Sequence, residues 1–316
     1  RIHVPFEHIA AASDFGYVMI DALRIDLPAT AAAYRAASTD FSDRVAADAS
    51  LLQRLGVDAV FANVSHVPLA AAQQAGIPAN ALCSLNWADL FAHYFGHEDW
   101  AAPVHAEMLA AYRGAHFMRT DPSMPMPDLP DQSVVGTIAA IGLERRAELR
   151  QELGVTAGNP RGTDRTARVG LVALGGIPMR LPIEDWPSVP GTHWLVPADW
   201  HPARADFHAI ELFDWPFADL LRSVDAVVTK PGYGTFAEAA GNGAAVLYQR
   251  RPDWPEQEPL IAWLHAHARA SEIADETLQR GSFATTLDAL LQTAVPPGPT
   301  FAGADTAARQ LAAMLK

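Results

Sequence analysis

Residues Ser223 to Glu258, SVDAVVTKPGYGTFAEAAGNGAAVLYQRRPDWPEQE, decide the fold class of this chain. Ala226–Val228 has the composition of a buried strand, and a second apolar run, Ala244–Tyr248, follows it. Between the two lies a turn, Lys230–Thr235, whose two glycines and one proline few other residue types could replace. A polar loop, Arg250–Glu258, closes the stretch. This order predicts one unit of a parallel α/β sheet.

The turn is expected to open into a helix over Phe236–Ala240, with Thr235 as N-cap and Glu238 three residues later. A glycine turn that points at a helix N-terminus attracts anions, because free backbone N–H groups and the helix dipole act in the same direction. The structural alternative is a tight strand-to-helix connection in which Glu238 only completes a capping box. Our working hypothesis is that a nucleotide diphosphate binds at this turn.

The composition is that of a globular protein with two domains. At 316 residues the chain is long for one domain; half of its residues are hydrophobic and 19% are charged. No apolar run approaches the roughly 18 residues of a membrane span, so we expect none, and we expect no secretory signal. The net charge of -13 argues against nonspecific binding to nucleic acid.

The single cysteine, Cys83, excludes an intramolecular disulfide and a multi-cysteine zinc site. It fits a reducing, cytoplasmic location, and its apolar surroundings predict a place in the core. The twelve histidines include no HExxH pattern. We therefore expect no metal, and no cofactor apart from the substrates.

The first half of the chain shows the same rhythm of strands and helices. Leu27–Leu55 carries apolar residues at helical spacing, which predicts one or two long helices. Asp58–Asn63 is expected to be a buried strand, Val67–Ala75 the helix after it and Ala81–Ser84 the next strand. These features predict an α/β protein with two doubly wound Rossmann-like domains.

Changes in composition suggest the domain boundaries. Residues 1–155 form the expected first domain, and residues 156–167, which are polar and lack periodicity, form the expected linker. Residues 168–300 form the expected second domain, including a strand over Phe207–Phe213. A last helix in residues 301–316 is expected to pack back towards the first domain.

Several motifs resemble those of GT-B glycosyltransferases. Gly232, Thr235 and Glu238 have the spacing found in the N-acetylglucosaminyl transferase of peptidoglycan synthesis. Most of the chain is similar to the glycosyltransferase-like portion that precedes the sugar-kinase domain of arabinokinases. That likeness rests on Asp14–Leu23, DAVFANVSHVPLAAAQQAGIP, Trp87–Tyr94, MPMP, RRAELRQELGV, KPGYGTFAEA and RRPDWPEQEP. The resemblance implies the GT-B fold, in which the two domains face each other across a cleft, with an acceptor-side domain in residues 1–155 and a nucleotide-sugar domain in residues 168–300. It also implies a UDP-linked sugar donor; it does not imply kinase activity, because the kinase domain lies outside it.

The resemblance also implies roles for particular residues. The nucleotide would contact Gly175, Gly176, Phe213, Lys230, Gly232, Tyr233, Gly234, Thr235 and Glu238. Among them, Glu238 would bind the ribose hydroxyls, Phe213 would flank the uracil and Lys230 would neutralise phosphate. The donor sugar would contact Glu256, Gln257 and Glu258, and the acceptor side would include Asn63, Asn86 and Trp87.

Each of these assignments has a structural alternative. Lys230 could be a surface lysine at a strand end, Gly175-Gly176 a packing turn and Glu256–Glu258 a solvated helix N-terminus. Trp87 could stack on a sugar or pack in the core. His66 follows the carboxyl end of a strand and is the candidate base for the acceptor hydroxyl; alternatively it makes a local bond at a helix N-terminus.

Two departures from the family pattern concern the first domain. Asn63 stands where the family often has an acidic residue. The first strand and its cleft-facing loop of glycine and histidine are not found after Arg1, so we expect them upstream in a longer protein, or lost.

The predicted function is transfer of a sugar from a nucleotide-sugar, UDP-linked, to a hydroxyl of a small-molecule or glycan acceptor, without a metal. The alternatives are hydrolysis or epimerisation of a nucleotide-sugar by a GT-B enzyme, and a non-catalytic nucleotide-sugar-binding protein. The sequence leaves the sugar, the acceptor and the oligomeric state open.

Overall fold

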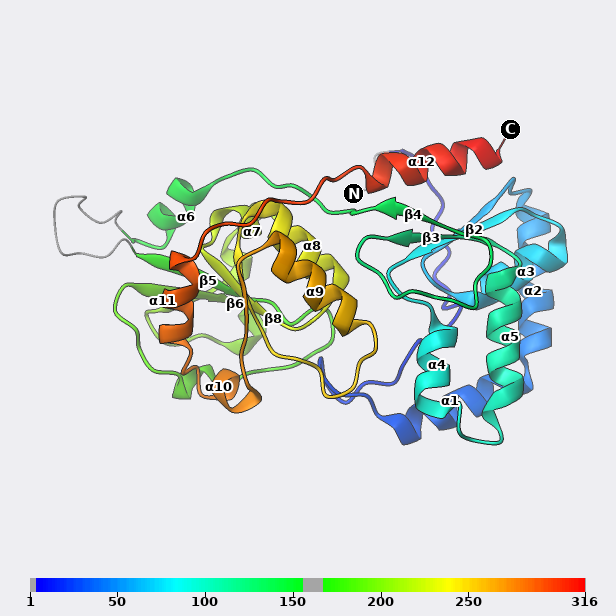
Figure 1. Cartoon of the computed structure of the whole chain (residues 1–316), viewed down its shortest axis with the longest axis horizontal. Coiled ribbons are helices and arrows are strands. Elements are labelled where there is room, and N and C mark those ends of the chain that lie inside the picture. The colour runs from blue at the N-terminus through cyan, green and yellow to red at the C-terminus, as the bar shows by residue number, and fades with distance from the viewer. Residues whose placement is uncertain (1–3, 156–166, 316) are drawn as a thin grey trace.

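The computed structural model describes residues 4–155 and 167–315. The chain forms two halves, each built on a parallel sheet with helices packed against it (Figure 1). No helix in the described ranges is both long and apolar enough to span a bilayer. The linker expected at residues 156–167 lies outside the described residues except for its last position.

The N-terminal half has a four-stranded sheet in the order β1-β2-β3-β4. Its strands are β1 (Val60–Ala62), β2 (Ala79–Cys83), β3 (His116–Thr120) and β4 (Gln132–Gly136), all parallel. Its helices are α1 (Leu27–Thr39), α2 (Phe41–Leu55), α3 (His66–Ala75), α4 (Trp87–Phe95) and α5 (Ala101–Arg113). The long helical segment, the first two strands and the helix between them are confirmed, with β1 shorter than expected.

The third and fourth strands of this sheet were not predicted. β3 reads HFMRT and β4 reads QSVVG, so neither shows the continuous apolar run of a strand buried on both faces. Helix α12 (Gly303–Met314) covers Met118 and Val135 on one face of these strands. Ser133 Oγ also donates to Gln310 Oε1 at 3.0 Å, so α12 contacts the strands of the N-terminal half.

The C-terminal half has a six-stranded parallel sheet in the order β10-β9-β8-β5-β6-β7. The strands are β5 (Arg168–Val172), β6 (Thr192–Val196), β7 (Phe207–Ala209), β8 (Ala226–Thr229), β9 (Ala245–Tyr248) and β10 (Ala270–Glu272). The helices are α6 (Arg146–Glu152), α7 (Phe217–Ser223), α8 (Tyr233–Asn242), α9 (Gln257–His267), α10 (Asp275–Gln279) and α11 (Ala284–Gln292). The strand order reverses between β5 and β8, and ligands of such sheets bind at that reversal, beyond the carboxyl ends of the strands.

Two local expectations were wrong. The strand expected over Phe207–Phe213 ends at Ala209, because the chain turns into a 3-10 helix, Ile210–Leu212. Helix α8 begins at Tyr233, so Thr235 is not its N-cap. Gly232 is the N-cap, and its carbonyl already accepts from Phe236 N at 3.1 Å, which places Thr235 inside the first turn.

The chain crosses between the halves along Thr137–Arg145, which lies on α7 and α8 (Figure 1). The next helix, α6, belongs to the C-terminal half: Leu149 is part of that core and Arg150 pairs with Asp225. We therefore propose that the first domain ends near residue 137, and that α6 lies in the second domain instead of the first.

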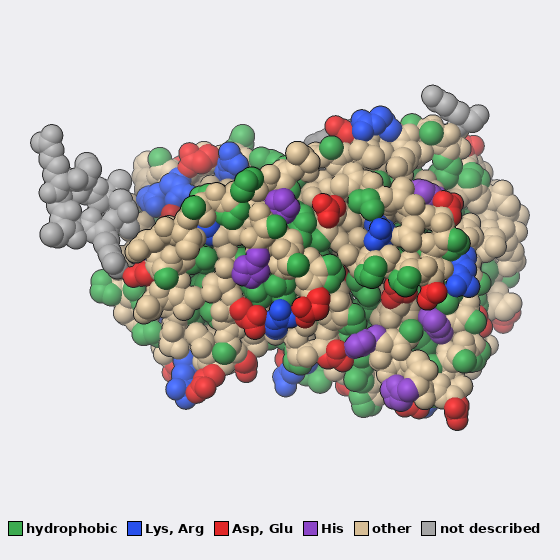
Figure 2. All heavy atoms as spheres, in the orientation of Figure 1, with side chains coloured by type: hydrophobic (Ala, Val, Ile, Leu, Met, Phe, Trp, Pro, Cys, Tyr) green, Lys and Arg blue, Asp and Glu red, His purple; other side chains and the backbone are tan. Residues whose placement is uncertain are grey.

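Each half also contributes a side chain to a hydrophobic core of the other half. Trp254, from the loop after β9, packs in the core of the N-terminal half, whereas Ala22 packs in a core of the C-terminal half. Charged side chains of both signs are interspersed over the face in Figure 2, without a continuous basic patch. Two cations lie where the halves meet: Lys230, which is partly buried, and Arg251, which is buried.

Candidate functional site

A cavity of about 420 Å³ lies between the two halves. The N-terminal half contributes Asp14, Phe15, Gly16, Tyr17, Met19 and Trp87, and the C-terminal half contributes Ile177, Lys230, Arg251 and Trp254. The C-terminal residues come from the loops after β5, β8 and β9, at the reversal of strand order. We call this cavity the cleft; its position is the one at which an open α/β sheet binds a ligand.

Lys230 lies between the two glycine turns that follow β5 and β8. A Cβ added to Gly175 would lie 3.6 Å from Lys230 Nζ, and one added to Gly232 would lie 3.8 Å from it. At Gly176 and Gly234 an added Cβ would meet no described atom within 4 Å. The ammonium group therefore faces space that the glycines leave open, which is the arrangement an anion requires.

The N-terminus of α8 adds hydrogen-bond donors to the same place. The N–H groups of Tyr233, Gly234 and Thr235 form its first turn and have no acceptor within the helix, and Gly232 supplies no side-chain cap. The helix dipole makes this end favourable for negative charge. The structure thus brings together seven of the nine residues predicted for the nucleotide, with Lys230 at the centre; the two exceptions are Phe213 and Glu238.

The surroundings of Lys230 destabilise its positive charge. Burial lowers the pKa of its ammonium group to about 8, the positive charge of Arg251 acts in the same direction, and Glu256 opposes both. No carboxylate oxygen of the described chain lies within 4.0 Å of Lys230. A bound phosphate would remove this penalty by supplying the missing counter-charge.

Arg251, which the sequence analysis did not single out, is the second cation of the cleft. Its side chain is 6% exposed, and its guanidinium carbon lies 3.5 Å from the ring centre of Trp254. Burial lowers the pKa of Arg251 to about 10. The signal in the sequence was the pair Arg250-Arg251 immediately after a buried strand, but the sequence does not indicate which of the two points inward.

The three residues predicted to bind the sugar have protein partners. Glu256 accepts from Ser84 Oγ at 2.6 Å and from Trp254 Nε1 at 2.9 Å, which ties this loop to the N-terminal half. The Gln257 side chain bonds the backbone N–H and carbonyl of Arg251 at 3.0 and 3.1 Å. Glu258 pairs with Arg250 at the surface. Sugar hydroxyls would have to share these groups, and the sugar-binding role stays a prediction.

Glu238 and Phe213 lie away from the cleft lining. Glu238 faces the crossing segment near Ala140; burial raises the pKa of its carboxyl, and a hydrogen bond from the Ala140 backbone opposes that rise. Phe213 is 7% exposed and packs on Trp215 with ring centres 4.9 Å apart. Tyr233 joins the crossing segment as well, since its hydroxyl accepts from Ile138 N at 2.8 Å. The ribose and uracil roles of Glu238 and Phe213 stay predictions.

His66 does not line the cleft. It is the first residue of α3 and stacks on Phe41, and its Nδ1 lies 3.6 Å from Asp14 Oδ2, too far for a hydrogen bond. Both atoms are buried without a hydrogen-bond partner in the described chain. His66 and Asp14 both line a small cavity of about 20 Å³, and Asp14 also lines the cleft. Asp14 thus stands between His66 and the cleft.

The structure separates the three residues predicted on the acceptor side. Trp87 lines the cleft and lies against Tyr17, with ring centres 5.7 Å apart. Asn86 is fully buried and caps α4, accepting from Asp89 N at 2.8 Å. Asn63 is exposed just beyond β1 and lines none of the described cavities near the cleft. Only Trp87 is therefore placed to touch a ligand of the cleft.

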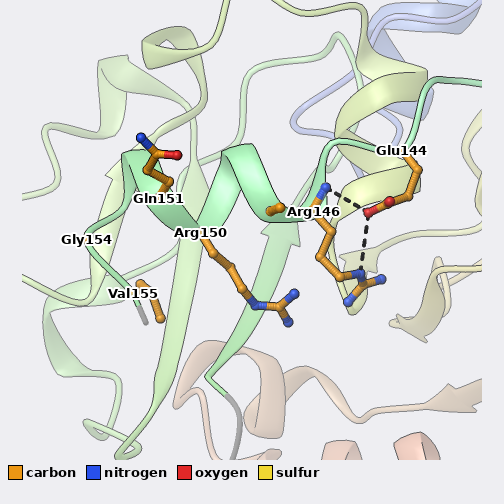
Figure 3. A pocket seen from close by; sticks show the side chains of 7 residues that line it. Glu144, Arg146, Arg150, Gln151, Gly154 and Val155 are labelled. Carbon is orange, nitrogen blue, oxygen red and sulfur yellow. Dashed lines mark hydrogen bonds and ion pairs between the residues drawn. The ribbon is translucent and has the colours of Figure 1, made fainter. Parts of the chain in front are cut away.

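A second large cavity, of about 620 Å³, follows the outer side of α6 (Figure 3). Its arginines already have partners: Arg146 and Arg150 both pair with Asp225, and Arg146 also bonds Glu144. None of the predicted site residues lines it. In residues 4–155 and 167–315, no group of three histidine, cysteine or carboxylate side chains is arranged to hold a metal ion.

Comparisons with known structures identify the architecture. A calicheamicin glycosyltransferase superposes on 91% of this chain and 81% of its own, with a TM-score of 0.58 and 16% identity. The chain has the GT-B fold. A glycosyltransferase of kitacinnamycin (TM-score 0.50, 16% identity, 92% of this chain and 80% of that one) has the same fold. So does a Listeria monocytogenes protein described as a UDP-N-acetylglucosamine 2-epimerase (0.53, 17%, 86% and 77%). The GT-B fold and the two Rossmann-like domains expected from the sequence are confirmed.

No family model matches the sequence. Among curated proteins, L-arabinokinase of Arabidopsis thaliana is 25% identical over 256 residues, which cover 78% of this chain. The chain spans 23% of the length of that relative. The likeness to arabinokinases seen in the motifs thus extends over most of the chain.

Proposed function

We propose that the chain binds a nucleoside diphosphate sugar in the cleft and transfers its sugar to a hydroxyl acceptor. The observation that carries the proposal is Lys230, whose Nζ lies beside both glycine turns and close to the free N-terminus of α8. The chain shares its fold with proteins named as glycosyltransferases and with one described as acting on a UDP-sugar. A diphosphate, with two acidic groups, suits a lysine and a set of backbone N–H groups.

In the proposed reaction the acceptor oxygen forms a bond to the anomeric carbon of the sugar, and the bond from that carbon to the diphosphate oxygen breaks. Negative charge develops on the departing nucleoside diphosphate, where Lys230 and the N–H groups of α8 stabilise it. Because these groups supply the positive charge, we propose that no divalent metal is needed. The acceptor proton passes to a carboxylate in the cleft wall, for which Asp14 is the candidate, with His66 behind it.

Release of UDP from a panel of UDP-sugars tests this proposal. We expect release only when a hydroxyl acceptor is present, with no change on addition of a metal chelator. Release without acceptor would instead indicate a hydrolase. Interconversion of the sugar would indicate an epimerase, an alternative favoured by the fold shared with the Listeria protein. Binding without any turnover would indicate a nucleotide-sugar-binding protein and would contradict the proposed reaction.

The affinity for a nucleotide sugar is expected to decrease as the pH rises above about 8. Lys230 must be protonated to attract the diphosphate, and burial together with Arg251 lowers its pKa to about 8. The affinity is therefore independent of pH near pH 6.5. Above pH 8 it decreases with a slope that approaches about tenfold per pH unit. Calorimetry with UDP-glucose measures this, since its diphosphate does not titrate in the range. An affinity that stays constant up to about pH 9 would show that Lys230 is not the anion-binding group.

A further inference from the structure

We propose that Arg251 binds a carboxylate that is separate from the diphosphate and is carried by the donor sugar or by the acceptor. The inference rests on the proposed function, because it assumes that Lys230 and the glycine turns hold the diphosphate. It assigns to the cleft a class of acidic substrate, and to Arg251 the recognition of that acid.

The guanidinium group of Arg251 has no paired carboxylate in the described residues. Within the described ranges its side chain makes one hydrogen bond, from Nε to Leu23 O at a long 3.5 Å, and no carboxylate oxygen lies within 4.0 Å of it. The terminal nitrogens are without a hydrogen-bond partner but remain accessible from the cleft. Burying a charged side chain is costly unless it is paired. Glu256 and Asp21 act on Arg251 electrostatically, but neither pairs with it, and a buried guanidinium without a paired carboxylate indicates a ligand.

No atom of Arg251 lies within 4 Å of a Cβ added to the glycines of the two turns, although its charge acts on Lys230. Lys230 contributes every described atom within 4 Å of a Cβ added to Gly175 or Gly232, and at Gly176 no atom is that close. Arg251 instead lies on Trp254, on the side of the cleft that faces Leu23 and the N-terminal half. A diphosphate held at the turns would therefore leave the guanidinium to the sugar or the acceptor.

The surroundings of Arg251 favour a carboxylate on a sugar-like ring. Guanidinium and carboxylate groups match in bidentate geometry. Trp87 lines the same cleft and is partly exposed, so it offers an aromatic face on which a sugar ring can stack, whereas the neighbouring Tyr17 and Trp254 are buried. The carboxylate of Asp14 also lies in the wall and makes a second doubly charged group unfavourable. A singly charged carboxylate is therefore favoured over a second phosphate at Arg251.

Calorimetric titration with UDP, UDP-glucose and UDP-glucuronic acid tests the donor as the source. We expect the wild-type chain to bind UDP-glucuronic acid about 10- to 100-fold more tightly than UDP-glucose, as one charge-assisted hydrogen-bonded pair provides. Arg251→Met should abolish this preference and change the affinity for UDP by less than about threefold. Arg251→Lys should retain part of it. Arg250→Met, which removes the neighbouring surface arginine paired with Glu258 and Glu272, is the matched control and should leave the preference intact.

The acceptor arm compares UDP release with glucuronic acid and with glucose as acceptors. A kcat/KM higher for the acid, and equalised by Arg251→Met, would place the carboxylate on the acceptor. Absence of a preference for the acid in both arms of the wild-type protein overturns the proposal, and this test does not depend on any variant folding. So does a loss of UDP affinity in Arg251→Met as large as the loss for UDP-glucuronic acid, because Arg251 would then contact the diphosphate. A wild-type chain that binds no UDP would contradict the proposed function as well, whereas UDP binding without a preference for acids contradicts only this inference.

Discussion

Replacing Lys230 with methionine is expected to weaken the binding of a nucleotide sugar by about 10- to 100-fold, the value of a hydrogen bond to a charged group. The rate of transfer should fall further, by about 10²- to 10³-fold, because the ammonium group stabilises charge that grows in the transition state. Methionine keeps most of the buried stem of the side chain and removes the charge. Calorimetry measures the first effect, and single-turnover release of UDP measures the second.

Lys316 is the one other lysine in the sequence, so Lys316→Met is a matched control that should bind and react like the wild type. The two variants also permit a chemical check. An amine-reactive reagent at about pH 8 should modify Lys230 readily, because its pKa is about 8, and bound UDP should protect it. Unchanged donor affinity in Lys230→Met would contradict the role given to this residue.

Replacing Asp14 with asparagine is expected to lower kcat by about 10²- to 10⁴-fold, the usual contribution of a general base. The affinity for the donor should change little, because Asp14 belongs to the opposite half of the cleft from Lys230. Asparagine keeps the shape of the side chain, so the buried contact with His66 is preserved. The measurement is the kcat for UDP release at saturating donor and acceptor.

His66→Gln is the comparison for this experiment. His66 lies behind Asp14 and does not line the cleft, so we expect a smaller loss of kcat than in Asp14→Asn. Full kcat in Asp14→Asn together with a large loss in His66→Gln would show instead that the histidine is the base, as the sequence alone suggested. The two variants therefore distinguish Asp14 from His66 as the base, although Asp14 Oδ2 and His66 Nδ1 lie only 3.6 Å apart.

The sequence was sufficient for those parts of the site that depend on local chain geometry. The conformation of the turn Lys230–Thr235 is determined locally, because its glycines and proline set the backbone angles that the turn can adopt. The apolar runs on either side of it form adjacent strands. The same holds for Gly175 and Gly176 after β5. Placing both turns at the reversal of strand order requires the order of the strands in the sheet, which the structure shows and the sequence did not predict.

Apart from Trp87, the opposite wall of the cleft could not be predicted, since it depends on contacts between distant residues. Glu256 bonds Ser84, 172 positions away, and Trp254 is buried in the core of the other half. Asp14 and Tyr17 belong to a segment without helical or strand periodicity; Asp14–Leu23 resembles arabinokinases, but nothing in it indicated a place in the cleft. Which of Arg250 and Arg251 points inward is decided by the Gln257 side chain, which fixes the backbone of Arg251.

A crystal structure of the chain with UDP bound tests the central claim most directly. We predict that the diphosphate lies in the cleft, with its oxygens bonded to the N–H groups of Gly232–Thr235 and to Lys230 Nζ. Arg251 should remain free to meet a group beyond the β-phosphate. UDP bound outside the cleft, for instance in the cavity along α6, would contradict the account, as would a cleft that stays empty at saturating UDP.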